Sequence, residues 1–441
     1  MIGFAGLSHL GINYSLATAA KGFDVIAFHP SQDLITDLNE GRFPIDEPGL
    51  EELFNASHSR IRYTADVRNL GDCDLVFIAL DVKTDDHNQS DIHPLEALID
   101  LVVPSLSPES DLVLLSQVRP GFTRSLRKKL LAHPASRVAE IHYQVETLVF
   151  GRAVERALFP ERYIVGVSDP THPLPTSLQH WHAAFNCPVL IMKYESAELA
   201  KIAINFFLVS SIATTNTLAE VCEKIGADWN EISPALHLDA RIGPKAYLNP
   251  GLGIAGGNLE RDLVTVKRLV AGTDTDTGVI DAWIHNSLHR KEWTVRTLRE
   301  ALDRRGMSAA NTTLGVWGLA YKENTHSVKN SPSITFLSNV PEYYKRVYDP
   351  TVRLSADAFP RWVQCDSALE CCMGADVLVI LTPWPQFRDI DLALIRNVMS
   401  GQILLDPYGL LNATRAIELD FDYHRLGFPS NYIKQAVIAE V

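Results

Sequence analysis

The N-terminal segment carries a pattern that strongly restricts the fold. An apolar strand candidate, Met1–Leu7, runs into a glycine loop that reads GLSHLG, and a helical pattern follows through Ala20. A second strand is expected at Asp24–Phe28. This order is typical of dinucleotide-binding domains, because the first glycine makes the turn, the last lets helix pack on strand, and the pyrophosphate rests on the helix N-terminus. The loop residues predicted to bind a cofactor are Gly6, Ser8, His9, Leu10 and Gly11.

Two positions depart from the usual dinucleotide-binding pattern. Ser8 replaces the middle glycine and is expected to crowd the pyrophosphate. His29 stands where an acidic residue normally binds the ribose, and Asp33 comes a few residues late. NAD is favoured over NADP because no arginine follows His29 until Arg42, although losing the acid keeps NADP open. A Rossmann domain with another ligand, or none, stays open as an alternative.

Alternating strand and helix patterns continue along the chain. Strands are expected at Leu75–Leu80, Leu112–Ser116 and Tyr163–Val167, with helices such as Pro94–Leu106 between them, which predicts a parallel doubly wound sheet. A second strand–loop–helix series begins at Thr312. The predicted fold class is therefore α/β, with two Rossmann-like doubly wound domains at residues 1–192 and 305–441. A central helical region at 193–304, with one long helix, is predicted to join them.

The central region contains an unusually apolar helix pattern, Glu198–Ala219. A helix that is apolar almost all round is expected to be buried. Lys201 and Asn205 share one face of it, and a buried lysine needs a partner or a lowered pKa. Lys201 is thus a candidate proton acceptor, the alternatives being a lysine that snorkels to solvent or pairs with Glu198. Asp281–Arg305 is expected to form one long helix.

A glycine-rich stretch, Leu238–Asp262, reads LDARIGPKAYLNPGLGIAGGNLERD. So much glycine and proline excludes a regular helix or strand, and predicts a loop whose backbone amides approach a ligand. Charged residues flank it on both sides. A tight structural connection is the alternative interpretation.

Bulk composition excludes several classes. The chain has 441 residues and a formal net charge of −13, which argues against a nucleic-acid partner. No secretory signal is recognised, and no apolar run is expected to be long enough to cross a bilayer, so no membrane association is predicted. The six cysteines are scattered without metal-ligand spacing, so free thiols in a cytoplasmic protein, with no metal, are expected.

Several motifs, in order, resemble the UDP-glucose/GDP-mannose dehydrogenase family over nearly the whole chain. They include LNEG followed by EPGL at 38–50, GRAVERALFPER at 151–162, Lys201 and Asn205 in a KxxxN pattern, the glycine-rich stretch, and GLAYK at 318–322. The resemblance implies oxidation of the C6 alcohol of a nucleotide sugar, such as a UDP-hexose, to a carboxylate by two NAD⁺ in succession. It also implies an N-terminal NAD domain, a central dimerisation region, a C-terminal nucleotide domain, a cytoplasmic homodimer and a role in polysaccharide precursor biosynthesis.

The departures from the family cluster around one chemical step. The family's catalytic cysteine, which forms a thioester, aligns with Asn258, and an amide cannot form that intermediate. Phe150 replaces an acid, Gln117 replaces a threonine, and LDVK at 80–83 replaces a VPTP turn. By resemblance, the catalytic residues are Lys201, Asn205, Asn258, Asp262 and Glu146. The substrate-binding residues are Arg241, Lys245, Tyr247, Gly253 and Lys322, and the cofactor set gains His29 and Gln117.

Three functions follow from these residues. The leading hypothesis is a single NAD-dependent hydride transfer from a nucleotide sugar, giving an aldehyde or ketone, or an epimer after re-reduction. A second is full four-electron oxidation by a non-covalent route, with Glu146 activating water. A third is a non-catalytic nucleotide-sugar-binding homologue.

Overall fold

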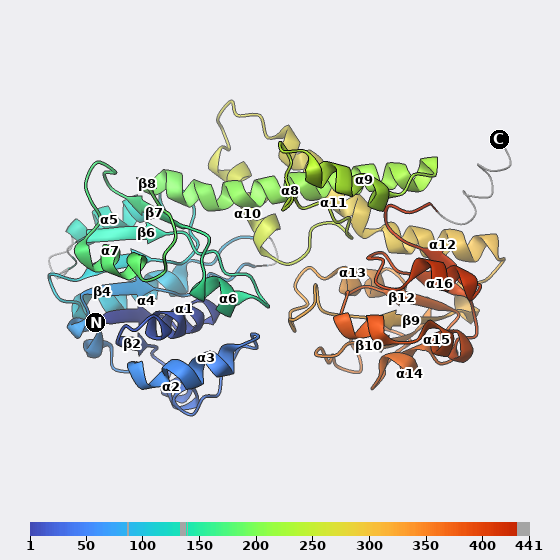
Figure 1. The fold of residues 1–441 in the computed structure, drawn as a ribbon, viewed down its shortest axis with the longest axis horizontal. Coiled ribbons are helices and arrows are strands. Elements are labelled where there is room, and N and C mark those ends of the chain that lie inside the picture. Colours follow the sequence, from blue (N-terminus) through green and yellow to red (C-terminus); the bar gives the residue numbers. More distant parts are fainter. Residues whose placement is uncertain (86–87, 133–137, 139, 430–441) are drawn as a thin grey trace. The chain divides into compact units, whose positions relative to one another are not determined.

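The computed structural model describes residues 1–85, 88–132, 138 and 140–429, and the chain divides into two compact units. Unit 1 is Met1–Ile204 and unit 2 is Asn205–Val441. Each contains one sheet with helices on its faces (Figure 1). The predicted α/β class with two Rossmann-like domains and a central helical region is confirmed. The domain limits predicted at residues 192 and 304 stay predictions.

The sheet of unit 1 has eight strands in the order β3-β2-β1-β4-β5-β6-β7-β8. Its strands are β1 Ile2–Ala5, β2 Val25–Phe28, β3 Ile61–Thr64, β4 Leu75–Ile78, β5 Asp111–Leu114, β6 Glu140–Gln144, β7 Tyr163–Val167 and β8 Val189–Lys193. The central strands β1, β2, β4 and β5 are buried along their whole length, as continuous apolar runs require. The prediction of a parallel sheet is wrong for one pair of strands, because β6 and β7 pair antiparallel. The connection from β6 to β7 does not return the chain to the end of the sheet where β6 began, so β7 runs in the opposite direction to β6.

Helices cover both faces of this sheet. Their bounds are α1 His9–Ala20, α2 Gln32–Asn39, α3 Leu50–Ser57, α4 His93–Val102, α5 Phe122–Ala132, α6 Ala153–Leu158 and α7 Thr176–Ala183. Apolar residues of α1, α2, α3 and α7 form the core on one face, and those of α4 and α5 form it on the other. The six strands in the order β3-β2-β1-β4-β5-β6 therefore build the expected dinucleotide-binding sheet. The strand order reverses between β1 and β4, which is the position where such sheets bind their ligand.

The long helix of the central region is α8, Tyr194–Ile225, with 32 residues. It extends the predicted helix at both ends, but the expectation of burial all round was wrong. Phe207 is 79% exposed, and Leu199, Leu218 and Val221 are exposed as well. Among the described residues, α8 is one helix whose length and composition would allow a membrane crossing, which corrects the expectation that no run reaches that length. A core helix of a globular protein meets the same two criteria.

The other central helices are α9 Trp229–Leu238, α10 Asn258–Leu269, α11 Gly278–Lys291 and α12 Trp293–Arg304. The single helix predicted at Asp281–Arg305 is therefore two helices that meet at Glu292. Arg290 and Trp293 on either side are buried, and both donate to the carboxylate of Glu223, at 2.6 and 2.9 Å. The predicted loop at Leu238–Asp262 is also shorter than expected, because its last five residues, Asn258–Asp262, begin α10.

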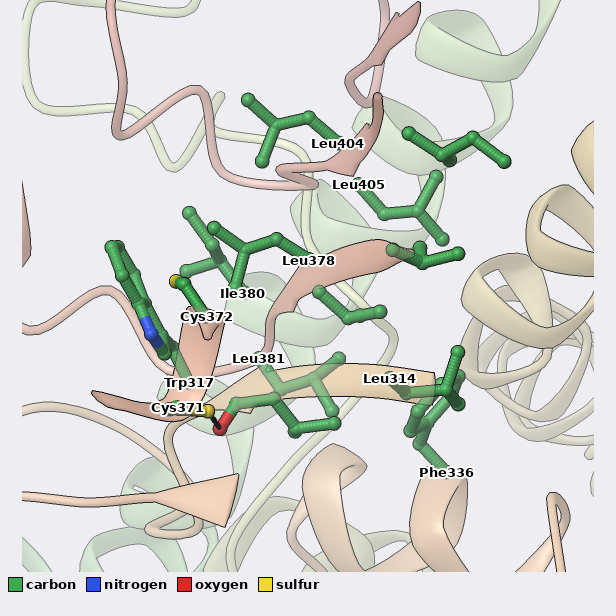
Figure 2. Packing of buried hydrophobic residues seen from close by; sticks show 14 of the residues in the cluster. Leu314, Trp317, Phe336, Cys371, Cys372, Leu378, Ile380, Leu381, Leu404 and Leu405 are labelled. Atoms are coloured by element: carbon green, nitrogen blue, oxygen red, sulfur yellow. Dashed lines mark hydrogen bonds between the residues drawn. The ribbon is translucent and has the colours of Figure 1, made fainter. Parts of the chain in front are cut away.

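The C-terminal sheet has six parallel strands in the order β11-β10-β9-β12-β13-β14. Its strands are β9 Thr313–Trp317, β10 Tyr344–Tyr348, β11 Trp362–Gln364, β12 Val377–Ile380, β13 Ile403–Leu405 and β14 Asp422–His424. The helices around it are α13 Pro332–Ser338, α14 Ala368–Cys372, α15 Leu392–Val398 and α16 Ala413–Glu418. Figure 2 shows its core, where Leu314, Leu378 and Leu404 come from three adjacent strands. In sequence order, these six strands repeat the arrangement of the first six strands of unit 1.

Candidate functional site

The turn between β1 and α1 has the backbone shape predicted for a dinucleotide cradle. Gly6 has a φ of +93°, a conformation that side chains disfavour. A Cβ atom on Gly11 would lie 1.8 Å from the carbonyl oxygen of Gly6, so only glycine permits this approach of helix to strand. The predicted loop therefore leads directly into the N-terminus of α1, where backbone amides are available to an anion.

An acidic side chain that the sequence analysis did not identify as a site residue lies at this N-terminus. Asp81, just after β4, accepts hydrogen bonds from the Ser8 hydroxyl at 2.6 Å and from the Leu10 amide at 2.9 Å. The Asp81 amide donates back to the Ser8 oxygen at 2.9 Å. Ser8 thus binds a carboxylate of the chain itself. The replacement of VPTP by LDVK was the signal that could have identified Asp81.

His9, the next residue of the loop, is held by a second acid. Its Nε2 lies 2.8 Å from the Glu47 carboxylate, which also accepts from the amides of Gly151 and Ala153. Burial opposes ionisation of Glu47, but these hydrogen bonds outweigh it and lower its pKa. The Phe150 ring lies 4.2 Å from the His9 ring, centroid to centroid. Phe150 therefore packs beside the cradle.

The two remaining cofactor candidates also lie at the carboxyl ends of strands. His29 follows β2, and its Nδ1 accepts from the Ser31 amide at 3.1 Å, while burial lowers its pKa. A neutral His29 offers no positive charge for a 2′-phosphate, which agrees with NAD. Gln117 follows β5 and is half-buried. The loop after it is fixed by the buried Glu198, which accepts from Gly121 and Thr123 amides at 2.6 and 2.8 Å.

In unit 1, the candidate catalytic residues Lys201 and Glu146 form a pair. The Lys201 Nζ atom lies 2.7 Å from the Glu146 carboxylate and donates to the Glu146 carbonyl oxygen at 3.1 Å. The two side chains are only 13% and 15% exposed. The same carboxylate accepts from the Leu148 amide at 3.0 Å. The lysine is thus partly buried, and its partner is Glu146, since Glu198 is engaged elsewhere.

In unit 2, Asn205 and Asp262 form a second pair. The Asn205 amide donates to Asp262 at 2.5 Å, and Arg261 donates to the other Asp262 oxygen at 3.1 Å. All three residues are buried. A buried carboxylate with a hydrogen-bond donor on each oxygen is held in one orientation, which suits a group that positions a water or a hydroxyl.

The glycine-rich loop before Asp262 is more open. The substrate candidates Arg241, Lys245 and Tyr247 are exposed, and Arg241 pairs with Asp239 at 2.7 Å. Gly253 has a φ of +75°, and a Cβ there would lie 2.5 Å from the Ser287 carbonyl oxygen. Asn258 is exposed in the first turn of α10. The structure therefore places Asn258 near Asp262 along α10, with Arg241, Lys245 and Tyr247 facing solvent.

The last substrate candidate, Lys322, belongs to the loop after β9. It is half-buried, with its Nζ 5.7 Å from the centroid of the Tyr321 ring. The same ring packs on Gly256, where a Cβ would lie 3.1 Å from it. Asn330 adds a hydrogen bond of 2.8 Å to the Gly256 carbonyl oxygen. Within unit 2, the glycine-rich loop and the loop after β9 are therefore in contact.

Neither a metal cluster nor a disulfide is found among the described residues. All six cysteines are free, and five of them are buried. Cys222 is buried in α8. The expectation of free thiols therefore agrees with the part of the chain that is described.

Comparison with known proteins decides the family. Three domain models of the UDP-glucose/GDP-mannose dehydrogenase family match: the NAD binding domain at residues 1–185, the central domain at 195–287 and the UDP binding domain at 315–413. The chain belongs to this family. It is an NAD-dependent oxidoreductase that acts on nucleotide sugars.

Similar proteins align with this family member from end to end. The UDP-glucose 6-dehydrogenase of Rickettsia bellii is 26% identical over 435 residues, covering 97% of this chain and 99% of the relative. The UDP-glucose 6-dehydrogenase of Pseudomonas aeruginosa is 28% identical, with 96% of each chain covered. A UDP-glucose dehydrogenase structure from Pyrobaculum islandicum aligns with a TM-score of 0.83 at 24% identity, covering 97% of each chain.

The backbone of the glycine loop in unit 1 fits the pyrophosphate of NAD, but one of its amides is already occupied. Gly6, Gly11 and the N-terminus of α1 provide the turn and the amides that a pyrophosphate needs. The Leu10 amide, however, already donates to Asp81. The cradle is therefore suited to the cofactor once Asp81 has moved.

Proposed function

We propose that this enzyme performs a single hydride transfer from a nucleotide sugar, most simply a UDP-hexose, and that its product is the aldehyde or ketone, or an epimer formed by re-reduction. The observation that carries the proposal is Asn258, an amide where the family pattern has its nucleophilic thiol. The Lys201–Glu146 and Asn205–Asp262 pairs support it, because they hold together the residues that the resemblance assigns to alcohol oxidation.

The chemistry divides between a proton and a hydride. The bound NAD⁺ supplies the acceptor for the hydride. Lys201, with a water held by Asn205 and Asp262, accepts the hydroxyl proton, a role that general-base catalysis makes worth about 10²–10⁴-fold in rate. Asn258 donates a hydrogen bond to the developing carbonyl oxygen, a contribution of about 2–4 kcal/mol. One alcohol and one oxidised cofactor would thus give one carbonyl, one reduced cofactor and one proton.

The decisive experiment counts NADH per sugar. We expect one equivalent of NADH per UDP-hexose and an aldehyde or ketone that hydroxylamine traps, or, where re-reduction gives the epimer, no net NADH and an epimeric UDP-hexose. Two equivalents with a uronic acid product would exclude the single-transfer proposal and favour four-electron oxidation, with Glu146 activating water. The matched variants Asn258→Cys and Asn258→Ser test the missing thiol, since only the cysteine can form a thioester. If only Asn258→Cys carries out a second oxidation, the result supports the proposal that the reaction stops after one hydride transfer because the thiol is missing.

A non-catalytic homologue is the second candidate, and one observation favours it. Asp81 engages the Leu10 amide and the Ser8 hydroxyl, where an anionic cofactor is expected to bind. Calorimetry that detects a UDP-sugar but neither NAD⁺ nor NADP⁺ at millimolar concentration would support this candidate over the enzyme.

We also propose a cytoplasmic homodimer with a role in polysaccharide precursor biosynthesis. The exposed apolar residues Leu199, Phe207, Leu218 and Val221 on α8 support a subunit interface, because apolar side chains gathered on one exposed helix favour association. We expect Phe207→Ser to shift the mass in sedimentation toward a monomer. Leu131→Ser, at an exposed leucine of α5, is the matched control. An unchanged dimer in Phe207→Ser would place the interface elsewhere.

A further inference from the structure

The N-terminus of α1 holds an anion that belongs to the protein. One oxygen of Asp81 accepts from both the Ser8 hydroxyl, at 2.6 Å, and the Leu10 amide, at 2.9 Å. The Asp81 amide returns a hydrogen bond of 2.9 Å to the Ser8 oxygen. The three bonds form a closed set that ties the segment after β4 to the glycine loop.

This carboxylate occupies the place best suited to a phosphate. The N-terminus of a helix carries unpaired amides and the positive end of the helix dipole, and both favour one negative group at close range. A pyrophosphate and a carboxylate cannot both accept from the Leu10 amide along the same direction. If the carboxylate stayed nearby, the two like charges would also repel each other.

The surroundings of Asp81 make the contact reversible. Asp81 is exposed, and its loop lacks the burial that would hold a side chain in place. A capping carboxylate at an exposed helix N-terminus is held by about 0.5–2 kcal/mol, which a ligand can overcome. The exposed Asp81 can therefore exchange a protein contact for water when a cofactor arrives.

We propose that Asp81 is an internal competitor for the pyrophosphate of NAD, and that it determines how tightly this enzyme binds its cofactor. In the free protein Asp81 closes the α1 N-terminus, and binding requires it to swing into solvent. The inference rests on NAD use by this family member, and it does not depend on whether one or two oxidations follow.

The test is calorimetric titration of the full-length protein with NAD⁺ and, separately, with inorganic pyrophosphate. Asp81→Asn keeps the shape and removes the charge, and Asp81→Ala removes the acceptor. Asp72→Asn makes the same change of net charge at an exposed acid at the end of a 3₁₀ turn of the same unit. We expect both Asp81 variants to bind NAD⁺ and pyrophosphate about tenfold more tightly than the wild type and Asp72→Asn. The gain should shrink as salt rises, because screening weakens the repulsion.

The outcomes separate this inference from the proposed function. Unchanged or weaker binding of both probes in folded Asp81→Asn and Asp81→Ala would overturn it, while wild-type NAD⁺ binding would leave the enzyme proposal intact. If no variant binds NAD⁺ but the Asp81 variants bind pyrophosphate more tightly, Asp81 does compete with a pyrophosphate, and the use of NAD by this protein is contradicted. Thermal unfolding confirms that each variant is folded, and Asp81→Ala replaces Asp81→Asn if the latter is not.

Discussion

The two sheets of this enzyme share one strand order over six strands, yet their first turns are held in different ways. Gly6 follows β1 with a φ of +93°, and Gly318 follows β9 with a φ of +98°. In unit 1, β2 and β3 lie on one side of β1, and β4, β5 and β6 lie on the other. In the C-terminal sheet, β10 and β11 lie on one side of β9, and β12, β13 and β14 lie on the other. Each turn also has a carboxylate bound to its backbone amides, which makes the position and burial of that acid the main difference.

In the C-terminal sheet the acid follows the second strand. Asp349 comes directly after β10 and accepts from the amides of Leu319 and Ala320 at 2.6 and 3.1 Å, and from the Trp384 indole at 3.2 Å. It is 1% exposed. The corresponding residue after β2 is His29, and the exposed Asp81 after β4 corresponds to Pro383 after β12. One turn is thus fixed by a buried acid, and the other is closed by an acid that can leave.

The largest expected difference is in stability when each acid is removed. Asp349→Ala strands several buried donors and should lower the free energy of unfolding by about 3–5 kcal/mol. Asp81→Ala removes an exposed acceptor and should cost about 1 kcal/mol or less. Urea unfolding of the two variants measures both values. Equal losses would show that the Asp81 contact is as permanent as the Asp349 contact.

The two turn glycines should differ next. Gly318→Ala forces a side chain into a positive φ, and its Cβ would lie 2.4 Å from the Thr382 side chain, so we expect a loss of about 2–4 kcal/mol. Gly6→Ala has the same backbone cost, but its nearest contact is a leucine side chain at 3.1 Å, so about 1–2 kcal/mol is expected. Thermal unfolding compares the pair. A larger loss in Gly6→Ala would contradict the tighter packing of the C-terminal turn.

Acid should weaken unit 1 through two buried histidines. Burial lowers the pKa of His142 and of His182 to about 4. Below pH 6.5 these histidines become protonated in the unfolded chain, whereas in the folded unit they stay neutral down to about pH 4. The free energy of unfolding therefore decreases as the pH is lowered from 6.5 to 4. The slope is at most about 1.4 kcal/mol per pH unit for each histidine.

Urea unfolding between pH 4.5 and 7 measures this slope. His182→Asn should reduce the slope and leave the part that His142 contributes, while His180→Asn, at an exposed histidine of the same helix, should leave the slope unchanged. In the C-terminal sheet, burial of Asp422 is outweighed by its bond to His424, and its pKa is lowered to about 2. That pair loses its stabilising effect only below the usual aspartate range. Identical slopes in the two histidine variants would rule out the assignment to His182.

The smallest expected effect concerns two helix caps. Ser331 is buried, accepts from the Ser333 amide at 3.2 Å and donates to the Leu319 carbonyl oxygen at 2.8 Å. Ser31 accepts only a 3.3 Å bond from Leu34 among the contacts described for its side chain. We expect Ser331→Ala to cost about 1–2 kcal/mol and Ser31→Ala about 0.5 kcal/mol in chemical denaturation. The reverse order would mean that the loop after β9 does not need its serine.

Much of the fold was predictable because its signals are local. Continuous apolar runs identified β1, β2, β4, β5 and β7, and the glycine loop identified the start of α1. The break at Glu292 was not predictable, because it depends on Glu223, which is distant in sequence. The exposed face of α8 was missed for a related reason. Composition gives the apolarity of a helix, whereas only the packing of its neighbours decides which side they cover.

The sequence by itself determined the family, the strand–helix alternation and the glycine positions, since each is a property of residue identity and spacing. Only the tertiary structure decided which side chains meet. It paired Lys201 with Glu146 and Asn205 with Asp262, and it brought Asp81 to the amide of Leu10. The physical reason is that a hydrogen bond depends on distances of about 3 Å between atoms, and residues far apart in sequence reach such distances only when the sheet sets their strand ends side by side.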